Sequence, residues 1–184
     1  MAKWFFEPGH TAAEFCVRHM MVTYVRGHFK NVRGTLEFDE RNPGPGAVEV
    51  VIDVRGLWTG DKDRDAHLLS KDFFDVEHHP EIRFRGSTSQ RSGALRWKVS
   101  GELTIRGVTR PAVLDVEFLG TWQTPWWEGN TDKGPKTRAG FVARTAVDRH
   151  QFGVSWNSKL DHGGFVVGDE AEIVVDAEAI REPD

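Results

Sequence analysis

Short stretches in which every second residue is apolar recur along this chain, and this alternation constrains the fold more than any other feature. Four of them span residues 48–54, 95–105, 139–147 and 171–179. Successive side chains of a β-strand point to opposite faces, so each stretch predicts a strand with one buried and one solvated face. A small domain with many such strands closes them into a barrel or stacks them as two sheets. A closed barrel has an interior that can hold a ligand.

The composition favours one domain and argues against several classes of protein. The 184 residues suit a single all-β domain over 1–184, and the formal net charge of -4 disfavours a general nucleic-acid binder, which needs a basic face. The single cysteine, Cys16, rules out an intrachain disulfide. No apolar run approaches the roughly 20 residues of a membrane-spanning helix or the core of a signal peptide. We therefore expect a soluble, cytoplasmic protein.

About eight strands and one or two short helices are expected. The strands are predicted at residues 11–18, 32–38, 48–54, 80–86, 95–106, 112–118, 138–148 and 170–179, with 95–106 the longest. One helix is expected at 19–26, lying across a barrel end, with Gly27 as its C-terminal glycine. A second is expected within 59–76, where Asp61, Asp63 and Asp65 suit the dipole of a first turn.

The remaining segments are predicted to be turns and loops. Residues 42–46 and 87–93 predict turns, a bulge or strand start is expected near residues 30–31, and residues 148–168 are a mixed loop. Residues 120–136 form a long loop that carries Trp122, Trp126 and Trp127. Tryptophan rings favour the headgroup level of a membrane. This loop is therefore expected to make transient membrane contact, or to fold back and plug a barrel end.

A set of motifs runs in order along nearly the whole chain. They are residues 8–11 (PGHT), 15–20 (FCVRHM), 25–29 (VRGHF), 32–34 (VRG), 59–60 (TG), 64–68 (RDAHL), 72–75 (DFFD), 79–84 (HPEIRF), 101–109 (GELTIRGVT), 149–153 (RHQFG) and 167–170 (VGDE). Together they resemble the YceI-like family. The resemblance implies an all-β, extended, eight-stranded antiparallel barrel of lipocalin-like shape. It also implies a binder of long polyisoprenoids, such as polyprenyl pyrophosphates or isoprenoid quinones. The tryptophan-bearing loop is less typical of the family.

An apolar barrel interior suits an isoprenoid tail, because burying apolar surface contributes roughly 25 cal/mol per Å2. We expect the tail to lie in the barrel lumen. Its predicted lining comprises Phe15, Val17, Leu36, Phe38, Ile52, Leu68, Phe73, Phe84, Trp97, Val99, Leu103, Ile105, Phe118, Phe141 and Ile173. The alternative is that these side chains fill a solid core.

A diphosphate or quinone head needs polar groups at the barrel mouth. The candidates are His19, Arg64, His67, Arg149, Trp156 and Asn157. The guanidinium fork of Arg64 or Arg149 matches the geometry of a phosphate. The alternative is that these two arginines form structural ion pairs, Arg64 with Asp65 and Arg149 with Asp148.

Neither a metal site nor a recognised catalytic motif is predicted. His78 and His79 are adjacent, and neighbouring strand residues point apart, so they are poorly placed to share a metal ion. The chain has no Gly-x-Ser-x-Gly elbow and no phosphate-binding glycine loop. We therefore predict a noncatalytic protein, without a cofactor, that binds or transports a polyisoprenoid. Two alternatives stay open: a small hydrolytic enzyme using Asp65, His67 and Arg149, and a ligand-free structural domain.

Overall fold

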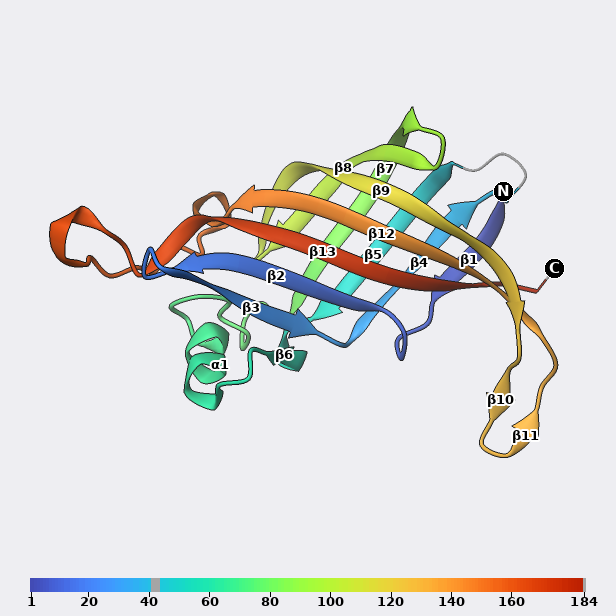
Figure 1. Cartoon of the computed structure of the whole chain (residues 1–184), viewed down its shortest axis with the longest axis horizontal. Coiled ribbons are helices and arrows are strands. Elements are labelled where there is room, and N and C mark those ends of the chain that lie inside the picture. The colour runs from blue at the N-terminus through green and yellow to red at the C-terminus, as the bar shows by residue number, and fades with distance from the viewer. Residues whose placement is uncertain (41–43, 184) are drawn as a thin grey trace.

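The computed structural model describes residues 1–40 and 44–183, and its strands form a long barrel (Figure 1). Eight of the described strands close on themselves. In their order around the ring they are β1 (Ala2–Phe6), β4 (Val32–Phe38), β5 (Pro45–Asp53), β7 (Glu81–Gly93), β8 (Arg96–Ile105), β9 (Val108–Thr124), β12 (Lys136–Asp148) and β13 (Val167–Arg181). Every pairing is antiparallel, and β13 returns to β1 to complete the ring. The predicted eight-stranded antiparallel barrel is confirmed.

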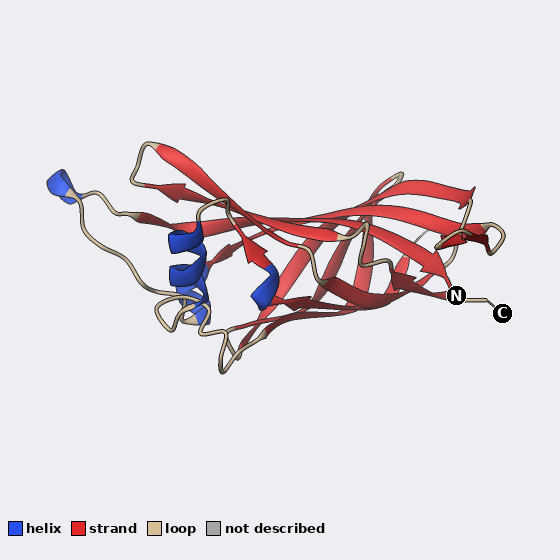
Figure 2. Ribbon diagram, turned by 90° about the horizontal axis from the view of Figure 1, so that it is seen from below, coloured by secondary structure: helices blue, strands red, loops and turns tan. Residues whose placement is uncertain are grey.

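The two ends of the barrel differ because β13 has two partners on the same edge. Its last residues pair with β1, at Trp4 and Arg181 for example, and its first part pairs with β2 (Ala12–His19). Beyond β2 the sheet continues through β3 (Thr23–Phe29) to the two-residue β6 (Leu57–Trp58). The barrel is therefore closed near the chain termini and splayed at the other end, where α1 (Lys62–Leu69) lies (Figures 1 and 2).

The α1 helix forms where the acidic run predicts it. Asp61 is the N-cap, and its carboxylate accepts a hydrogen bond of 3.0 Å from the Arg64 backbone N–H. Ser70 ends the helix, and its N–H donates to the carbonyls of Ala66 and His67. Short 3-10 turns occur at η1 (Val54–Gly56), η2 (Arg149–Phe152) and η3 (Asp161–Gly163). Among the described residues, no helix has the length and apolar character needed to span a membrane.

The helix predicted at residues 19–26 is wrong. β2 and β3 form a hairpin there, and Met20 and Met21 take φ angles of 48° and 63° at its tip. Gly27 lies inside β3 and has a packing role: a Cβ at this position would be 2.3 Å from two ring atoms of Phe15. The apolar residues of this segment have no clear period, so pairing with β2 decides its conformation.

Two loop predictions and the prediction of the longest strand also need correction. Residues 87–93 are strand, since β7 continues to Gly93 and the turn lies at Ala94 and Leu95. The longest strand is β9, with 17 residues, rather than 95–106. Within 120–136, β9 runs on to Thr124 and a small hairpin of β10 (Trp127–Glu128) and β11 (Thr131–Asp132) follows. The turn predicted at 42–46 lies partly outside the described residues, and Pro45 already belongs to β5.

Aromatic side chains fill the closed end of the barrel. The Phe38 ring is fully buried, with centroid distances of 4.9 Å to Phe118, 5.2 Å to Phe141 and 5.9 Å to Trp4. Trp4 lies on β1, a strand that the sequence did not predict, and its indole N–H donates to the Phe38 carbonyl. This solid packing, here called the aromatic plug, confines any interior space to the splayed end.

Candidate functional site

The splayed end encloses a cavity of about 540 Å³ with a largely apolar lining. Side chains from the barrel strands, from β2 and β3, from α1 and from the loop after β12 contribute to its wall. Nine of the predicted tail-lining residues border it: Phe15, Val17, Ile52, Leu68, Phe73, Phe84, Leu103, Ile105 and Ile173. The cavity argues against the solid-core alternative at this end of the barrel.

The other six predicted lining residues do not border the cavity. They are Leu36, Phe38, Trp97, Val99, Phe118 and Phe141. All are buried and belong to the hydrophobic core, and three of them are rings of the aromatic plug. Alternation identifies the inward face of a strand, but it carries no information on the height of a residue along the barrel axis.

Several residues that border the cavity are not among those predicted from the sequence. Val25 borders the cavity from β3, in a segment where the sequence pattern predicts a helix. Val50 shares the inward face of β5 with Ile52, so the alternation itself is a sufficient signal for it. Phe152 and Val154 line the cavity from the loop after β12, where no periodic pattern marks them.

Two groups of aromatic rings shape the cavity. Phe15, Phe29 and Phe74 pack with centroid distances between 5.8 and 6.5 Å, which joins β2 and β3 to the segment after α1. The second group links α1 to the loop after β12, since the His67 ring lies 4.7 Å from the Trp156 ring. Phe73 completes this group at 5.1 Å from His67 and 5.4 Å from Trp156.

Arg64 lies at the cavity mouth with part of its guanidinium available. Its Nε donates to Thr59 Oγ1 at 2.8 Å, and its Nη2 donates to the Thr59 carbonyl at 3.0 Å. Asp65 accepts from the N–H and hydroxyl of the same Thr59, so the expected Arg64–Asp65 ion pair is replaced by a shared threonine. Among the described residues, nothing accepts a hydrogen bond from Arg64 Nη1, and this nitrogen is free to meet a ligand.

Arg149 borders the cavity but has little capacity left for a ligand. Its side chain is buried and donates to the carbonyls of Gly168, Val154, Trp156 and Val167 at 2.7 to 3.2 Å. Burial lowers the pKa of the guanidinium from its ordinary value. These bonds satisfy most of its five N–H donors. Arg149 therefore fastens the loop after β12 to the start of β13.

Asn157 has a similar structural role and does not border the cavity. Its side-chain amide donates to the Val167 carbonyl at 2.7 Å and accepts from the Val167 N–H at 3.0 Å, as a neighbouring strand would. The other head-group candidates, His19, His67 and Trp156, do line the cavity.

The charges around the cavity are balanced. Three arginines (Arg18, Arg64 and Arg149) and three carboxylates (Glu14, Asp61 and Asp63) border it. The Arg64 backbone N–H holds the pKa of the Asp61 carboxyl below its usual range, so this carboxylate stays ionised beside the arginine. The mouth consequently presents no strongly positive pocket.

The residues of the hydrolytic alternative do not form a joint site. His67 Nε2 lies 2.9 Å from Asp72 Oδ2, whereas Asp65 is bonded to Thr59. Arg149 donates to backbone carbonyls instead of to either group. The partner of His67 is thus Asp72, and neither Asp65 nor Arg149 lies in position to act with this imidazole as the hydrolytic alternative requires.

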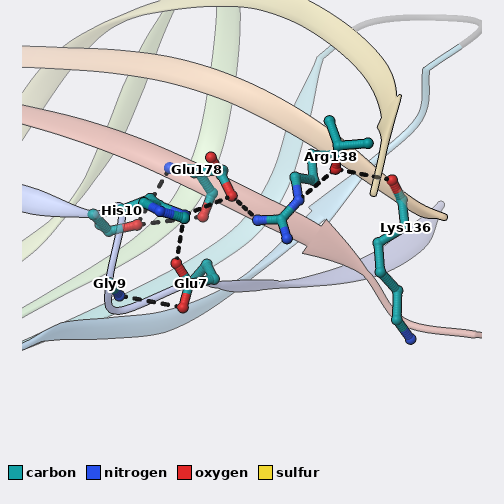
Figure 3. Close-up of polar contacts among 8 residues, drawn as sticks. Glu7, Gly9, His10, Lys136, Arg138 and Glu178 are labelled. Carbon is teal, nitrogen blue, oxygen red and sulfur yellow. Dashed lines mark hydrogen bonds and ion pairs between the residues drawn. The ribbon is translucent and has the colours of Figure 1, made fainter. Parts of the chain in front are cut away.

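A polar cluster joins the β1–β2 connection to β13 (Figure 3). His10 Nδ1 lies 2.8 Å from Glu7 Oε2 and 3.3 Å from Glu178 Oε1, and Arg138 also contacts Glu178. One ligand-type atom from each of Glu7, His10 and Glu178 lies within 4.8 Å of the others. The spacing of ligand-type residues along the sequence does not indicate this cluster, because Glu178 is far along the chain from the two other residues. His10 lies between the two carboxylates and Arg138 pairs with Glu178, so the cluster fastens the β1–β2 connection to β13, which indicates a structural role.

The segment that carries the tryptophans, from the end of β9 to the β10–β11 hairpin, lies at the barrel end opposite α1 (Figure 1). Trp122 is 76% exposed and Trp127 is also exposed, so neither ring plugs the barrel. The third ring, Trp126, has the Arg138 guanidinium 5.0 Å from its centroid. The membrane contact predicted for these rings would therefore take place far from the cavity mouth.

Comparisons with known proteins agree with this architecture. The chain is 34% identical over 176 residues to a UPF0312 protein of Photorhabdus laumondii, covering 95% of this chain and 84% of that one. A YceI protein of Campylobacter jejuni superimposes with a TM-score of 0.74 at 25% identity, covering 91% of this chain and 90% of that chain. A polyisoprenoid binding domain from Saccharophagus degradans shares the fold, with a TM-score of 0.67, 10% identity and coverage of 99% and 100%.

A family model supplies the assignment. The model for the YceI-like domain matches residues 4–179, which include every strand of the closed ring in whole or in part. The match extends from β1 through the α1 segment to β13, so it covers the cavity and the aromatic plug together. The chain belongs to the YceI-like family.

Proposed function

We propose that this protein binds a long-chain polyisoprenoid without catalysing a reaction, with the tail in the cavity and the head at its mouth. The observation that carries the proposal is the apolar cavity of about 540 Å³ at the splayed end. Its size falls within the range of small-molecule sites, roughly 300–1,000 Å³. The fold shared with the Saccharophagus degradans polyisoprenoid binding domain supports the ligand class.

The lining explains how a tail without polar atoms is retained. Each buried methylene contributes about 0.8 kcal/mol, so several isoprene units supply substantial binding energy without any hydrogen bond. Part of this energy offsets the ordering of a flexible tail. The rings of Phe15, Phe74 and Phe84 line the cavity, and such large apolar side chains suit branched isoprene units.

The mouth favours a weakly charged head group. A diphosphate near Arg64 also approaches Asp61 and Asp63, whose charges repel it. A quinone carries no net charge, and its carbonyl oxygens accept hydrogen bonds from donors such as Arg64 Nη1. Of the two head groups that the family resemblance implies, the charge balance supports an isoprenoid quinone over a polyprenyl pyrophosphate.

Native mass spectrometry with added lipid tests the proposal. The purified protein is incubated separately with an isoprenoid quinone and with a polyprenyl diphosphate of the same chain length. We expect a one-to-one complex that is stronger with the quinone. Absence of a complex with both lipids contradicts the proposed function, and a stronger diphosphate complex contradicts only the head-group assignment.

A matched pair of variants locates the tail. Ala171 borders the cavity and pairs with Val17 and Val147, so Ala171→Phe places a ring inside it. Ala146 is exposed on β12, and Ala146→Phe adds the same ring outside the barrel. The first variant is expected to lose at least about tenfold in lipid affinity, whereas the second keeps it. Equal affinities place the tail elsewhere. Transport of the lipid and a cytoplasmic location stay predictions.

A further inference from the structure

Large apolar side chains are exposed at the splayed end of the barrel. Met20, Met21 and Val22 form the turn between β2 and β3, and Val22 is 86% exposed. Phe165, in the loop before β13, is 47% exposed. These four residues are here called the apolar tip. Buried positions are the ordinary place for such residues in a water-soluble domain, so a group of them at a protruding turn points to a contact surface.

The apolar tip belongs to one local structure. The Met20 N–H donates to the Val166 carbonyl at 2.7 Å, which ties the turn to the loop containing Phe165. A Cβ added to Gly164 would lie 3.2 Å from Met21 Cγ, so the methionine side chain packs against this glycine. Arg18 supports the turn from below, with its Nη2 donating to the Met21 carbonyl at 2.8 Å.

The apolar tip is continuous with the rim of the cavity. Arg18 and His19 precede Met20 in the chain, Val166 and Val167 follow Phe165, and all four border the cavity. Figures 1 and 2 place the β2–β3 turn and the loop before β13 at the same end as α1. A surface that covers the apolar tip therefore also faces the cavity mouth.

Charged groups flank the tip in a way that suits a bilayer surface. Arg18 lies at the base of the turn, and Lys159 pairs through its backbone with Phe165. Lysine and arginine stems accompany apolar side chains into the interface while their charged ends stay at the headgroups. Asp161 is a nearby acidic group in the same loop, so the attraction to anionic lipid is moderate.

We propose that the apolar tip inserts into the surface of a lipid bilayer and holds the cavity mouth against it. This inference rests on the proposed function, because a polyisoprenoid resides in membranes and its tail pays a large free-energy penalty on crossing water. Exposing each methylene to water costs about 0.8 kcal/mol. Direct passage of the tail from the bilayer to the cavity avoids this cost, which is the main barrier to loading. Insertion of the tryptophan end leaves the mouth far from the membrane, so it does not provide this passage.

The experiment compares two variants that remove exposed apolar residues from opposite ends. The tip variant is Val22→Asp with Phe165→Ser, and the matched control is Trp122→Ser with Trp127→Ser. Cosedimentation with phosphatidylcholine vesicles, with and without anionic lipid, measures membrane binding. The rate of quinone extraction from the same vesicles measures loading, and quinone affinity in detergent micelles measures the cavity itself.

The tip variant is expected to lose about tenfold or more in vesicle binding and extraction rate while keeping its affinity in micelles. The control variant is expected to match the wild type in all three. Unchanged vesicle binding in the tip variant overturns the inference, as does a loss confined to the tryptophan variant. If the wild type does not bind vesicles but forms a dimer that the tip variant abolishes, the apolar tip contacts a second copy of the chain. That outcome also overturns the inference. Failure of every form to bind quinone in micelles contradicts the proposed function and leaves the vesicle result as an independent test of the tip.

Discussion

The His67 imidazole meets the Trp156 indole edge to face, with ring centroids 4.7 Å apart and ring planes at 83°. His67 lies on α1 and Trp156 on the loop after β12, so this contact bridges two segments that the strand ladders do not join. Both residues also border the cavity. The pair therefore connects the position of the helix to the shape of the binding site.

Trp156→Ala is expected to loosen α1 and weaken lipid binding. An aromatic pair contributes about 0.5–1.5 kcal/mol beyond its buried area, so a loss of up to about tenfold in affinity follows from the contact. Hydrogen exchange of the α1 amides and a quinone titration measure the two effects. Trp122→Ala, at an exposed position of β9 outside the cavity, is the matched control. Unchanged exchange in α1 would falsify the bridging role.

Phe38→Ala is expected to destabilise the fold without emptying the site. Phe38 is fully buried in the aromatic plug and does not border the cavity. Loss of a buried phenylalanine costs roughly 3–5 kcal/mol in the free energy of unfolding, which urea denaturation measures. Quinone affinity of the folded fraction is expected to equal that of the wild type. A parallel loss of affinity would show that the tail reaches the plug.

Gly27→Ala is expected to destabilise the protein by about 1–3 kcal/mol, because the added methyl overlaps the Phe15 ring. Phe15→Ala in the same background removes the overlap, so the two substitutions are expected to be strongly nonadditive. Gly93→Ala, whose Cβ meets only ordinary contacts, is the control and is expected to stay within about 0.5 kcal/mol. Additive effects in a double-mutant cycle of urea denaturation would contradict the proposed packing.

Arg149→Met is expected to cost roughly 3–5 kcal/mol in the free energy of unfolding, because it leaves several buried carbonyls without a donor. Arg149→Lys is expected to recover little, since one ammonium group cannot reach carbonyls on both sides of the loop. Arg144→Met, on the exposed face of β12, is the control and changes thermal stability little. A mild effect for Arg149→Met would place those carbonyls in contact with water.

His78 and Asp75 are expected to stabilise the fold over a limited pH range. A side-chain hydrogen bond of 2.9 Å to Asp75 raises the pKa of His78, and the same bond lowers the pKa of Asp75. The histidine contribution is fully present below its unfolded pKa of about 6.5 and is lost as the pH rises through its raised folded value. The aspartate contribution is present above its unfolded pKa of about 3.9 and is lost as the pH falls through its lowered value.

His78→Gln is therefore expected to destabilise the protein more at about pH 5.5 than at about pH 8.5, as measured by urea denaturation. His162→Gln is the control, because His162 lies in an exposed turn away from α1. Equal effects of His78→Gln at the two pH values would show that the bond does not depend on the charge of the imidazole.

Local patterns in the sequence were sufficient for seven of the eight ring strands, all but β1, and for the faces that these seven bury. Each of three strands has apolar residues at every second position, and these include Ile52 on β5, Phe84 on β7 and Ile105 on β8. All three residues border the cavity, so they point inward as predicted. The acidic run before Arg64 likewise predicted α1, because capping and the helix dipole act within a single turn. These features depend on neighbours in the chain, which the sequence displays directly.

Tertiary structure decided where the barrel is solid and where it is hollow. Phe38 and Phe84 lie on strands with the same alternation, yet Phe38 packs against Trp4 of β1 and Phe84 borders open space. The difference arises because β13 pairs with β1 at one end and with β2 at the other. Residues 19–26 form a hairpin through pairing with the adjacent β2, and a long-range hydrogen bond from Met20 to Val166 ties its turn to the loop that contains Phe165. No local period encodes these contacts, since they depend on which strands become neighbours when the sheet closes.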